Sequence, residues 1–401
     1  MPLTDIEVSL TDQEREIRAT AHRFAEEVLR PVGQILDRLP DPADVIAPTS
    51  PLWDAFKKHA ALNLDALDYA GGELTPLERT RLRFIVSEEM GWGDSGLAIS
   101  LGVAGFHKMF AQMSGRPALM ERYGGADNRD IGCWAVTEPD HGSDSLTVTE
   151  RHFGDPKLKA NCTAQRDGDE YVVNGQKSAW VSDGTIATVA TLFCTVDPSQ
   201  GFKGGGVCLV PLDLPGVSRG KPLDKLGQRA LNQGEIFFDN VRIPADYMIV
   251  GPEVYSTVVE GVLTMANAAM GAIFVGLARA ALELALAYAK ERVQGGVPIF
   301  EHQSVKARLF KMFMQVEAAR SLAWRVMLYN STNPPLVQYS IASKVFCTNT
   351  AFEVASGALQ IFGGNGLTRE YPIEKMLRDA RASMIEDGCN DVLSLVGAAK
   401  L

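Results

Sequence analysis

The spacing of apolar and polar positions divides the chain into three parts. Residues 1–132 carry apolar side chains at helical spacing behind clear N-cap signals. Residues 133–247 change to short, often alternating segments separated by turns, and residues 248–401 return to the helical period. The pattern predicts an α+β multidomain fold with an N-terminal all-helical domain, a middle β-sandwich or barrel domain and a C-terminal four-helix bundle.

Helix-capping residues mark the N-terminal part most clearly. Thr11 and Glu14 form a capping box, and the following helix is expected to end at Arg30 and Pro31 because proline interrupts helical hydrogen bonding. Thr75 begins a later helix with the same arrangement of threonine, proline and glutamate. No strand pattern interrupts these segments, so this part is predicted to form a helical layer.

The middle part is predicted to be a small all-β unit. Short segments such as 171–173, 187–196 and 206–210 are rich in apolar and β-branched residues. Asn174-Gly175 is expected to turn the chain between two strands. Many short strands without intervening helices favour a sandwich or barrel.

The C-terminal part is predicted to be a bundle. Gly295-Gly296, Asn333-Pro334-Pro335 and a glycine-rich stretch at 363–366 interrupt its helical period. The four expected helices span 253–292, 301–330, 334–363 and 371–398. Short connections between long helices favour antiparallel packing.

Composition excludes several classes of protein. The 401 residues are 46% apolar and 22% charged, which suits two or three globular domains and not a disordered chain. The formal net charge is -10 with no run of basic residues, so a nucleic-acid partner is not expected. The six cysteines form no CxxC pair, and neither a disulfide framework nor a metal site is expected.

No targeting segment or membrane span is expected. The first residues lack a basic stretch followed by an apolar one, so we expect a cytoplasmic protein. The most apolar stretch, 261–289, is interrupted by Asn267, Arg279 and Glu283. It therefore reads as a buried helix and not as a membrane span.

Residues 91–96 match the dinucleotide pattern GxGxxG only formally. The preceding residues 79–90 are helical, whereas a dinucleotide fingerprint needs a strand before it and a helix after it. We therefore interpret the segment as a turn between two helices, with Asp94 as the N-cap of the second. With no other such fingerprint, we expect an electron carrier other than nicotinamide.

Two segments of the β part carry candidate chemistry. Residues 134–144 read WAVTEPDHGSD, and residues 174–184 read NGQKSAWVSDG, so each supplies a tryptophan and small hydroxyl side chains. Together they can form a wall for a flat heterocycle. Gly142 and Ser143 lie in a turn whose backbone N–H groups can hold a phosphate or a ring carbonyl.

These segments resemble the acyl-CoA dehydrogenase family of flavoproteins. The family elements TEPxxGSD and NGxKxWIT/SNG are similar to 134–144 and 174–184. Further similarities are KLGxR at 225–229, DNVRIP at 239–244, the ER and EHQ element at 291–292 and 301–303, and QIxGGNG with EYPxEKxxRDA at 360–380. These elements, in order over about 250 residues, are more specific than any single glycine motif.

The resemblance implies FAD as cofactor and assigns residues to it. The family positions that contact the flavin ring and the pyrophosphate correspond to these residues of the chain: Trp134, Val136, Thr137, Gly142, Ser143, Trp180 and Ser182. Arg292 would meet the FAD of a neighbouring subunit, and Gln360, Gly363 and Gly364 would approach its adenosine part. The resemblance also implies an acyl-CoA substrate, a homotetramer and an electron-transfer flavoprotein as partner.

The expected catalytic base differs from that of the family. Desaturation of an acyl thioester needs a carboxylate to remove the α proton, and the family's usual glutamate position falls on Asp387. Aspartate is one methylene shorter, roughly 1.3–1.5 Å of reach. Glu386, at the family's tyrosine position, and Asp94 are the alternative bases.

Other family positions near the thioester also differ. An alternative glutamate position falls on Ala266, and the adjacent arginine position on Asn267. Leu231 and Gln233 replace small hydroxyl residues. Asn267 and Glu386 are the expected substrate contacts, and the set of departures favours a cyclic, branched or already unsaturated acyl group. Different chemistry, like that of a nitroalkane oxidase or a thioester lyase, and a non-catalytic acyl-CoA-binding subunit remain alternatives.

Overall fold

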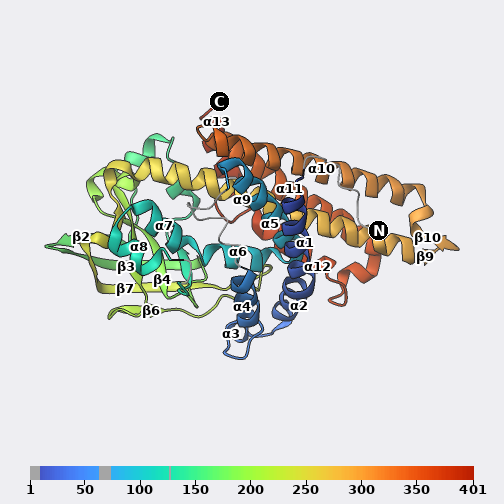
Figure 1. Cartoon of the computed structure of the whole chain (residues 1–401), viewed down its shortest axis with the longest axis horizontal. Helices are drawn as coiled ribbons and strands as arrows, with labels where there is room; N and C mark the ends of the chain where they lie inside the picture. The colour runs from blue at the N-terminus through green and yellow to red at the C-terminus, as the bar shows by residue number, and fades with distance from the viewer. Residues whose placement is uncertain (1–9, 63–73, 126–127) are drawn as a thin grey trace.

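The three predicted parts follow one another along the chain in the computed structural model. The structure describes residues 10–62, 74–125 and 128–401. Helices of the N-terminal part stand against the middle of a long helical bundle, and the β-sheet lies at one end of the molecule (Figure 1). The sheet ends at Val250, beyond the expected boundary at 247, because its last strand pairs with an inner one.

The N-terminal part is helical throughout its described residues. Its helices are α1 (Asp12–Phe24), α2 (Arg30–Arg38), α3 (Pro42–Val45), α4 (Leu52–Leu62), α5 (Pro76–Gly93), α6 (Ser95–Val103), α7 (Phe106–Ser114) and α8 (Pro117–Tyr123). Both expected capping boxes are present, with the side chain of Thr11 accepting from Glu14 N and that of Thr75 from Glu78 N. Asp94 caps α6 by accepting from Leu97 N at 2.9 Å.

The prediction that Arg30 and Pro31 end the first helix is wrong. A π-helical turn over Ala25–Leu29 joins α1 directly to α2, and Pro31 lies in the first turn of α2. Proline is tolerated there because the hydrogen-bonding pattern already changes at the π turn. The Arg30 guanidinium stacks on Trp92 at 3.4 Å from the ring centroid and donates to its carbonyl oxygen at 2.8 Å.

The β part forms one branched eight-stranded sheet. Its strands are β1 (Gly132–Ala135), β2 (Thr163–Asp167), β3 (Glu170–Ser182), β4 (Val189–Thr195), β5 (Gly205–Pro211), β6 (Val217–Arg219), β7 (Gln233–Pro244) and β8 (Met248–Val250). The order is β6-β7-β3-β1-β4-β5-β8, and β2 pairs with both β3 and β4. A buried apolar cluster that includes Val173, Leu192 and Ile243 forms the core of this part.

Asn174-Gly175 does not turn the chain as the sequence predicted. β3 runs through both residues, and the register against β7 shifts between Val173 and Gly175. Gly175 has φ 131°, and a Cβ there would lie 2.6 Å from the Cα of Cys162. The pair therefore forms a bulge at a close backbone approach, and the turn between β2 and β3 falls at 168–169.

The C-terminal part is a helical bundle with a broken last helix. Its helices are α9 (Pro252–Glu291), α10 (Gln303–Thr332), α11 (Val337–Phe362), α12 (Ile373–Ser383) and α13 (Asn390–Ala398), and a hairpin of β9 (Val293–Gln294) and β10 (Val297–Pro298) joins α9 to α10. The single helix expected over 371–398 is therefore wrong. Asp387 and Gly388, with φ 51° and 96°, are left-handed and cannot continue a right-handed helix.

Helix α9 is the central element of the bundle. By length and composition it could cross a membrane, but 67% of its most apolar window is buried inside the protein, as in a core helix. It crosses α5 closely: a Cβ at Gly91 would lie 2.0 Å from the carbonyl oxygen of Ile273, and one at Gly276 would lie 2.0 Å from that of Glu88. Gly91 of the GxGxxG-like segment thus serves the packing of α5 against α9.

Candidate active site

The two tryptophan-bearing segments are neighbours in the sheet. Strand β1 pairs antiparallel with β3, and Trp134 lies opposite Ser182. Just beyond β1, Thr137 accepts a hydrogen bond from the backbone N–H of Ser178 at 2.9 Å. The sheet therefore brings the residues predicted to contact one flat ring onto adjacent stretches of backbone.

The two tryptophans have different surroundings. Trp134 is half-buried among aromatic rings, 4.9 Å from both Phe106 and Phe193 between centroids. Trp180 is 56% exposed and lies in a part of β3 where the register against β7 is irregular. Trp180 therefore offers an uncovered aromatic face, whereas Trp134 is held in place by its neighbours.

A buried ion pair connects the same two segments. The Lys177 ammonium lies 2.7 Å from the Glu138 carboxylate and 2.8 Å from the Val136 carbonyl oxygen. Glu138 also accepts from the backbone N–H groups of Asn161 and Cys162. The glutamate of the TEP sequence and the lysine of the NGxK sequence thus hold the strands together and do not face a substrate.

The glycine turn after Pro139 meets the loop that carries the candidate base. The N–H of Gly142 donates to Asp144 Oδ1 at 2.7 Å, so this donor is already used. No atom lies within 4 Å of a Cβ placed on Gly142, so there is open space beside it, but its carbonyl oxygen also accepts from Ser145 Oγ at 2.7 Å. Ser143 Oγ accepts from the backbone N–H of Cys389 at 2.9 Å.

Glu386 and Asp387 occupy the loop between α12 and α13. Both are half-buried, and Gln228 Nε2 donates to Glu386 Oε1 at 2.5 Å. No hydrogen bond reaches the carboxylate of Asp387 from any described residue. Glu386 is therefore fixed by a partner, and Asp387 has a carboxylate available for proton transfer.

Burial shifts the pKa values of the groups around this loop. It raises the pKa of Glu386 to about 7, with Asp387 adding to the rise. It also raises the pKa of Asp387, while the charge of Lys344 acts against that rise. Burial lowers the pKa of Lys344 and of Lys225 to about 8, although nearby carboxylates oppose it in both cases. Two acids with raised pKa values therefore lie near two lysines with lowered ones.

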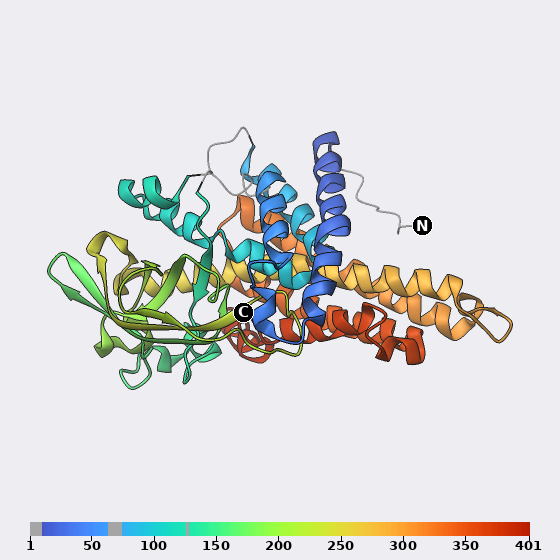
Figure 2. The ribbon, with the colours of Figure 1, turned by 90° about the horizontal axis from the view of Figure 1, so that it is seen from below.

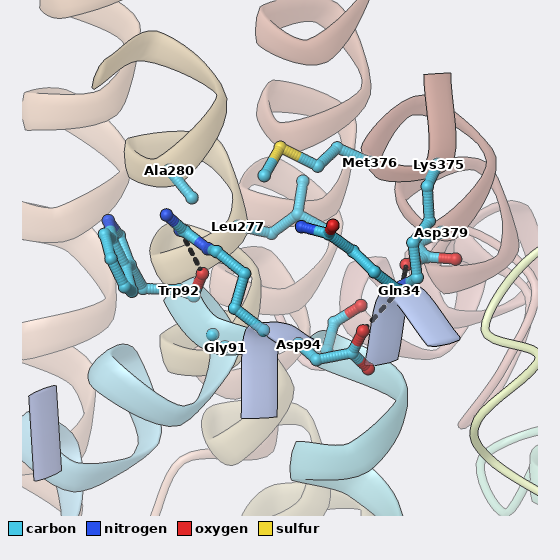
Figure 3. A pocket seen from close by; sticks show the side chains of 12 residues that line it. Gln34, Gly91, Trp92, Asp94, Leu277, Ala280, Lys375, Met376 and Asp379 are labelled. Carbon is cyan, nitrogen blue, oxygen red and sulfur yellow. Dashed lines mark hydrogen bonds and ion pairs between the residues drawn. The ribbon is translucent and has the colours of Figure 1, made fainter. Parts of the chain in front are cut away.

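Asp94 is not placed to act as a base. Its Oδ2 accepts from the Lys375 ammonium at 2.6 Å, and its Oδ1 caps α6. Lys375 also pairs with Asp379, and Figure 3 shows the three side chains together at the edge of a small pocket. Because both carboxylate oxygens are already bound, Asp94 serves as a buried structural charge.

Asn267 is also enclosed. It has no exposed surface, its amide donates to the carbonyl of Leu263 on the preceding turn of α9, and its Oδ1 has no partner among the described residues. Gln233, by contrast, donates to Ser182 Oγ at 3.2 Å and accepts from Lys225 at 2.7 Å. The structure thus brings Gln233, and not Asn267, against a residue predicted to contact the ring.

The model of the acyl-CoA dehydrogenase middle domain matches residues 133–241, and that of the C-terminal domain matches residues 256–401. The mitochondrial short-chain specific acyl-CoA dehydrogenase of Rattus norvegicus is 30% identical over 400 residues, covering 98% of this chain and 91% of the relative. The chain belongs to the acyl-CoA dehydrogenase family.

Two further relatives are similar to nearly the whole of this chain. The probable acyl-CoA dehydrogenase YngJ of Bacillus subtilis is 30% identical over 405 residues, covering 98% of each chain. The structure of butyryl-CoA dehydrogenase from Megasphaera elsdenii superposes with a TM-score of 0.86 at 26% identity, covering 98% of this chain and 99% of that one. The predicted fold class and the prediction that the chain is an enzyme are confirmed.

Members of the acyl-CoA dehydrogenase family are FAD-dependent, and several features of this chain fit that cofactor. The exposed side chain of Trp180 and the hydroxyl of Ser182 lie on the same strand, β3. Their chemistry suits an aromatic ring with polar edge atoms. These residues would hold the flavin end of FAD.

The residues assigned to the adenosine end lie elsewhere. Arg292, Gln360, Gly363 and Gly364 are exposed, and Tyr288 stacks on Phe362 at 4.0 Å where α9 and α11 end together. Figures 1 and 2 both place this end of the bundle far from the sheet. A single copy of this chain therefore does not bring the residues assigned to the flavin end and those assigned to the adenosine end to the same FAD.

Sequence reasoning assigned no site role to Lys225, Gln228 or Lys344, and it noted Gln233 only as a departure from the family pattern. Lys225, Gln228, Gln233 and Lys344 surround the Glu386–Asp387 loop and Ser182. Lys344 is the hardest to find because a lysine inside an apolar helical pattern gives no local indication of its partners. Lys225 and Gln228 lie within the KLGxR element at 225–229, and Gln233 follows it closely, which was the available signal.

Proposed function

We propose that this acyl-CoA dehydrogenase uses FAD to dehydrogenate an acyl-CoA thioester, with Asp387 as the base. The observation that carries the proposal is the hydrogen bond from Cys389 N to Ser143 Oγ. It joins the loop of Asp387 to the glycine turn that the family pattern assigns to FAD. This bond supports placing the candidate base and the candidate flavin contacts in one site, although they are far apart in the sequence.

The roles of the chain's residues follow from that arrangement. Asp387 would take the α proton of the thioester, which requires its carboxylate to be ionised. The backbone N–H of Asp387 has no acceptor among the described residues and can donate to the thioester oxygen, where negative charge develops. Bound FAD would supply the acceptor for the hydride from the β carbon. Trp180 and Ser182 would orient the ring.

The substrate is proposed to be a non-standard acyl group, cyclic, branched or already unsaturated. Asp387 reaches less far than glutamate, and a short displacement matters in proton transfer. Leu231 is fully buried, and Gln233 bonds Ser182 in place of a small hydroxyl residue. These differences surround the expected thioester end and support a substrate seated differently from a straight-chain one.

The assembly is proposed to be a homotetramer that passes electrons to an electron-transfer flavoprotein. Phe310 and Met314 lie one turn apart on α10 with 60% and 51% exposure. Such side chains on a long helix favour contact with another chain. A second chain would also bring an Arg292 end to the sheet end of its neighbour.

Anaerobic mixing with a panel of acyl-CoA thioesters tests the proposed function. Straight, branched and cyclic thioesters should bleach the flavin absorbance, with the branched or cyclic ones faster than butyryl-CoA. Bleaching by none of them would overturn the proposal. Peroxide release from nitroalkanes would instead support the alternative in which Asp387 acts on an already acidic carbon.

A further inference from the structure

Lys344 is a fully buried lysine with an unusual set of partners. It lies on α11 with no exposed surface, and its ammonium donates to the Gly388 carbonyl oxygen and to Asn390 Oδ1, each at 2.8 Å. Both acceptors are neutral. A buried ammonium whose hydrogen-bond acceptors are all neutral is costly unless negative charge lies near it, so the charges around Lys344 matter as much as its hydrogen bonds.

The bonds of Lys344 fall on the turn that follows Asp387. Asp387 is left-handed at φ 51°, a conformation that non-glycine residues rarely adopt, and Gly388 follows it at φ 96°. The Gly388 carbonyl is held by Lys344 from the bundle side, and the Cys389 N–H is held by Ser143 from the sheet side. These two bonds hold the carbonyl and the N–H of one peptide group, the one that joins Gly388 to Cys389, and so fix the chain one residue beyond the candidate base.

Negative charge near Lys344 comes from the same loop. Asp387 and Glu386 are the carboxylates whose charge acts on its ammonium, and Cys389 adds a smaller contribution. In the opposite direction, Lys344 is the basic group whose charge acts on Asp387. The charge of Glu386 acts on Lys225 as well as on Lys344, and its carboxylate accepts a hydrogen bond from Gln228.

We propose that Lys344 is a positioning residue for Asp387: it anchors the left-handed turn and supplies the positive charge that keeps the Asp387 carboxylate ionised. The inference rests on the proposed function, in which Asp387 is the base. Lys344 touches the loop and not the substrate, so it acts through Asp387. Without it, burial and the neighbouring Glu386 would both favour the protonated acid.

The test compares Lys344→Met with wild type in the flavin-loaded enzyme. The rate of flavin reduction by butyryl-CoA, or by the fastest thioester of the panel, is measured against pH. We expect the acidic limb of the profile to move upward by about one pH unit or more, as for loss of an opposite charge beside a carboxyl. Hydrogen exchange of residues 384–390, followed by mass spectrometry, should also speed up by about tenfold or more, about 1.4 kcal/mol of lost protection.

Thr348→Val is the matched control. Thr348 lies one turn from Lys344 on α11 and accepts from Asn390 at 3.0 Å, so its loss disturbs the same neighbour without changing charge. It should leave the acidic limb in place. If Lys344→Met lowers thermal stability but moves neither the acidic limb nor the exchange of 384–390, Lys344 is only structural and the proposal is wrong.

Two further variants keep the outcomes separate. Lys344→Gln retains a hydrogen-bond donor without the charge and replaces Lys344→Met if that protein does not fold. It should move the acidic limb while preserving more of the loop protection. A wild-type rate in Asp387→Asn would overturn the base assignment and this proposal with it, whereas a slow Asp387→Asn with an unmoved limb in the Lys344 variants would overturn only the role of Lys344.

Discussion

The Lys177 ammonium and the Glu138 carboxylate lie 2.7 Å apart, each with about 1% of its side chain exposed. Lys177 comes from β3, and Glu138 follows β1, so the pair ties together the two segments that approach the proposed flavin site. Family sequence elements are often read as ligand contacts. Here two of their charged residues contact each other and fix the strand geometry on which those contacts depend.

Breaking that pair should destabilise the protein strongly. Lys177→Met leaves Glu138 buried without its opposite charge, and we expect a loss of about 3–5 kcal/mol in the free energy of unfolding. Urea unfolding followed by circular dichroism measures it. Lys58→Met, at an exposed pair with Asp54, is the control and should change stability by about 0.5 kcal/mol or less. Equal losses in the two variants would contradict the assignment.

Asp183→Asn should stabilise the protein at neutral pH. Asp183 is fully buried, and burial raises its pKa well above the usual value, while bonds from Ser100 and Asn232 act against the rise. A raised pKa in the folded state gives stability at low pH that is lost as pH rises above the unfolded value near about 3.9. Asparagine does not titrate, so the variant avoids that loss.

The stability gain of Asp183→Asn should depend on pH. The two proteins should be about equally stable near pH 4, and the difference should then grow by up to about 1.4 kcal/mol per pH unit. Thermal unfolding between pH 4 and 7.5 measures this trend, with the exposed Asp213→Asn as a control. A gap that stays constant with pH would show that Asp183 is charged in the folded protein.

Asp387→Asn should slow flavin reduction by roughly 10²–10⁴, the usual contribution of a positioned general base. FAD content and ligand binding should remain, because no hydrogen bond to another described residue depends on this carboxylate. Asp387→Glu restores the longer arm and should retain activity or favour straight-chain thioesters. Glu386→Gln is the control and should keep most of the rate; a stopped-flow trace that is slow only in Glu386→Gln would move the base to Glu386.

Arg292→Ala should weaken FAD retention and assembly together. Arg292 lies between α9 and β9, and Figure 1 places β9 far from the sheet of the β domain, so its proposed contact with FAD requires a second chain. Light scattering gives the oligomeric state, and the ratio of flavin to protein absorbance gives retention. Arg166→Ala on β2 is the control and should change neither. Monomers of Arg292→Ala that keep full flavin would contradict the shared site.

The sequence by itself determined the order of the three parts, most helix starts and the family. Helix starts are local, because Thr11, Thr75 and Asp94 bond to backbone groups within three residues. The family elements are likewise contiguous stretches of sequence. Local patterns misled where a tertiary contact overrode them, as at Asn174-Gly175, where the close approach of Cys162 makes a bulge out of an expected turn.

Only the tertiary structure decided which polar side chains meet at the site. Lys344 and Gly388 are far apart in the sequence, as are Gln228 and Glu386, yet both pairs are hydrogen-bonded. From the sequence alone Asp94 is an alternative base, whereas in the structure its carboxylate is bound to the Lys375 ammonium. A residue type at a position reveals what it can do, whereas its availability and its pKa depend on partners and burial that only the folded chain assembles.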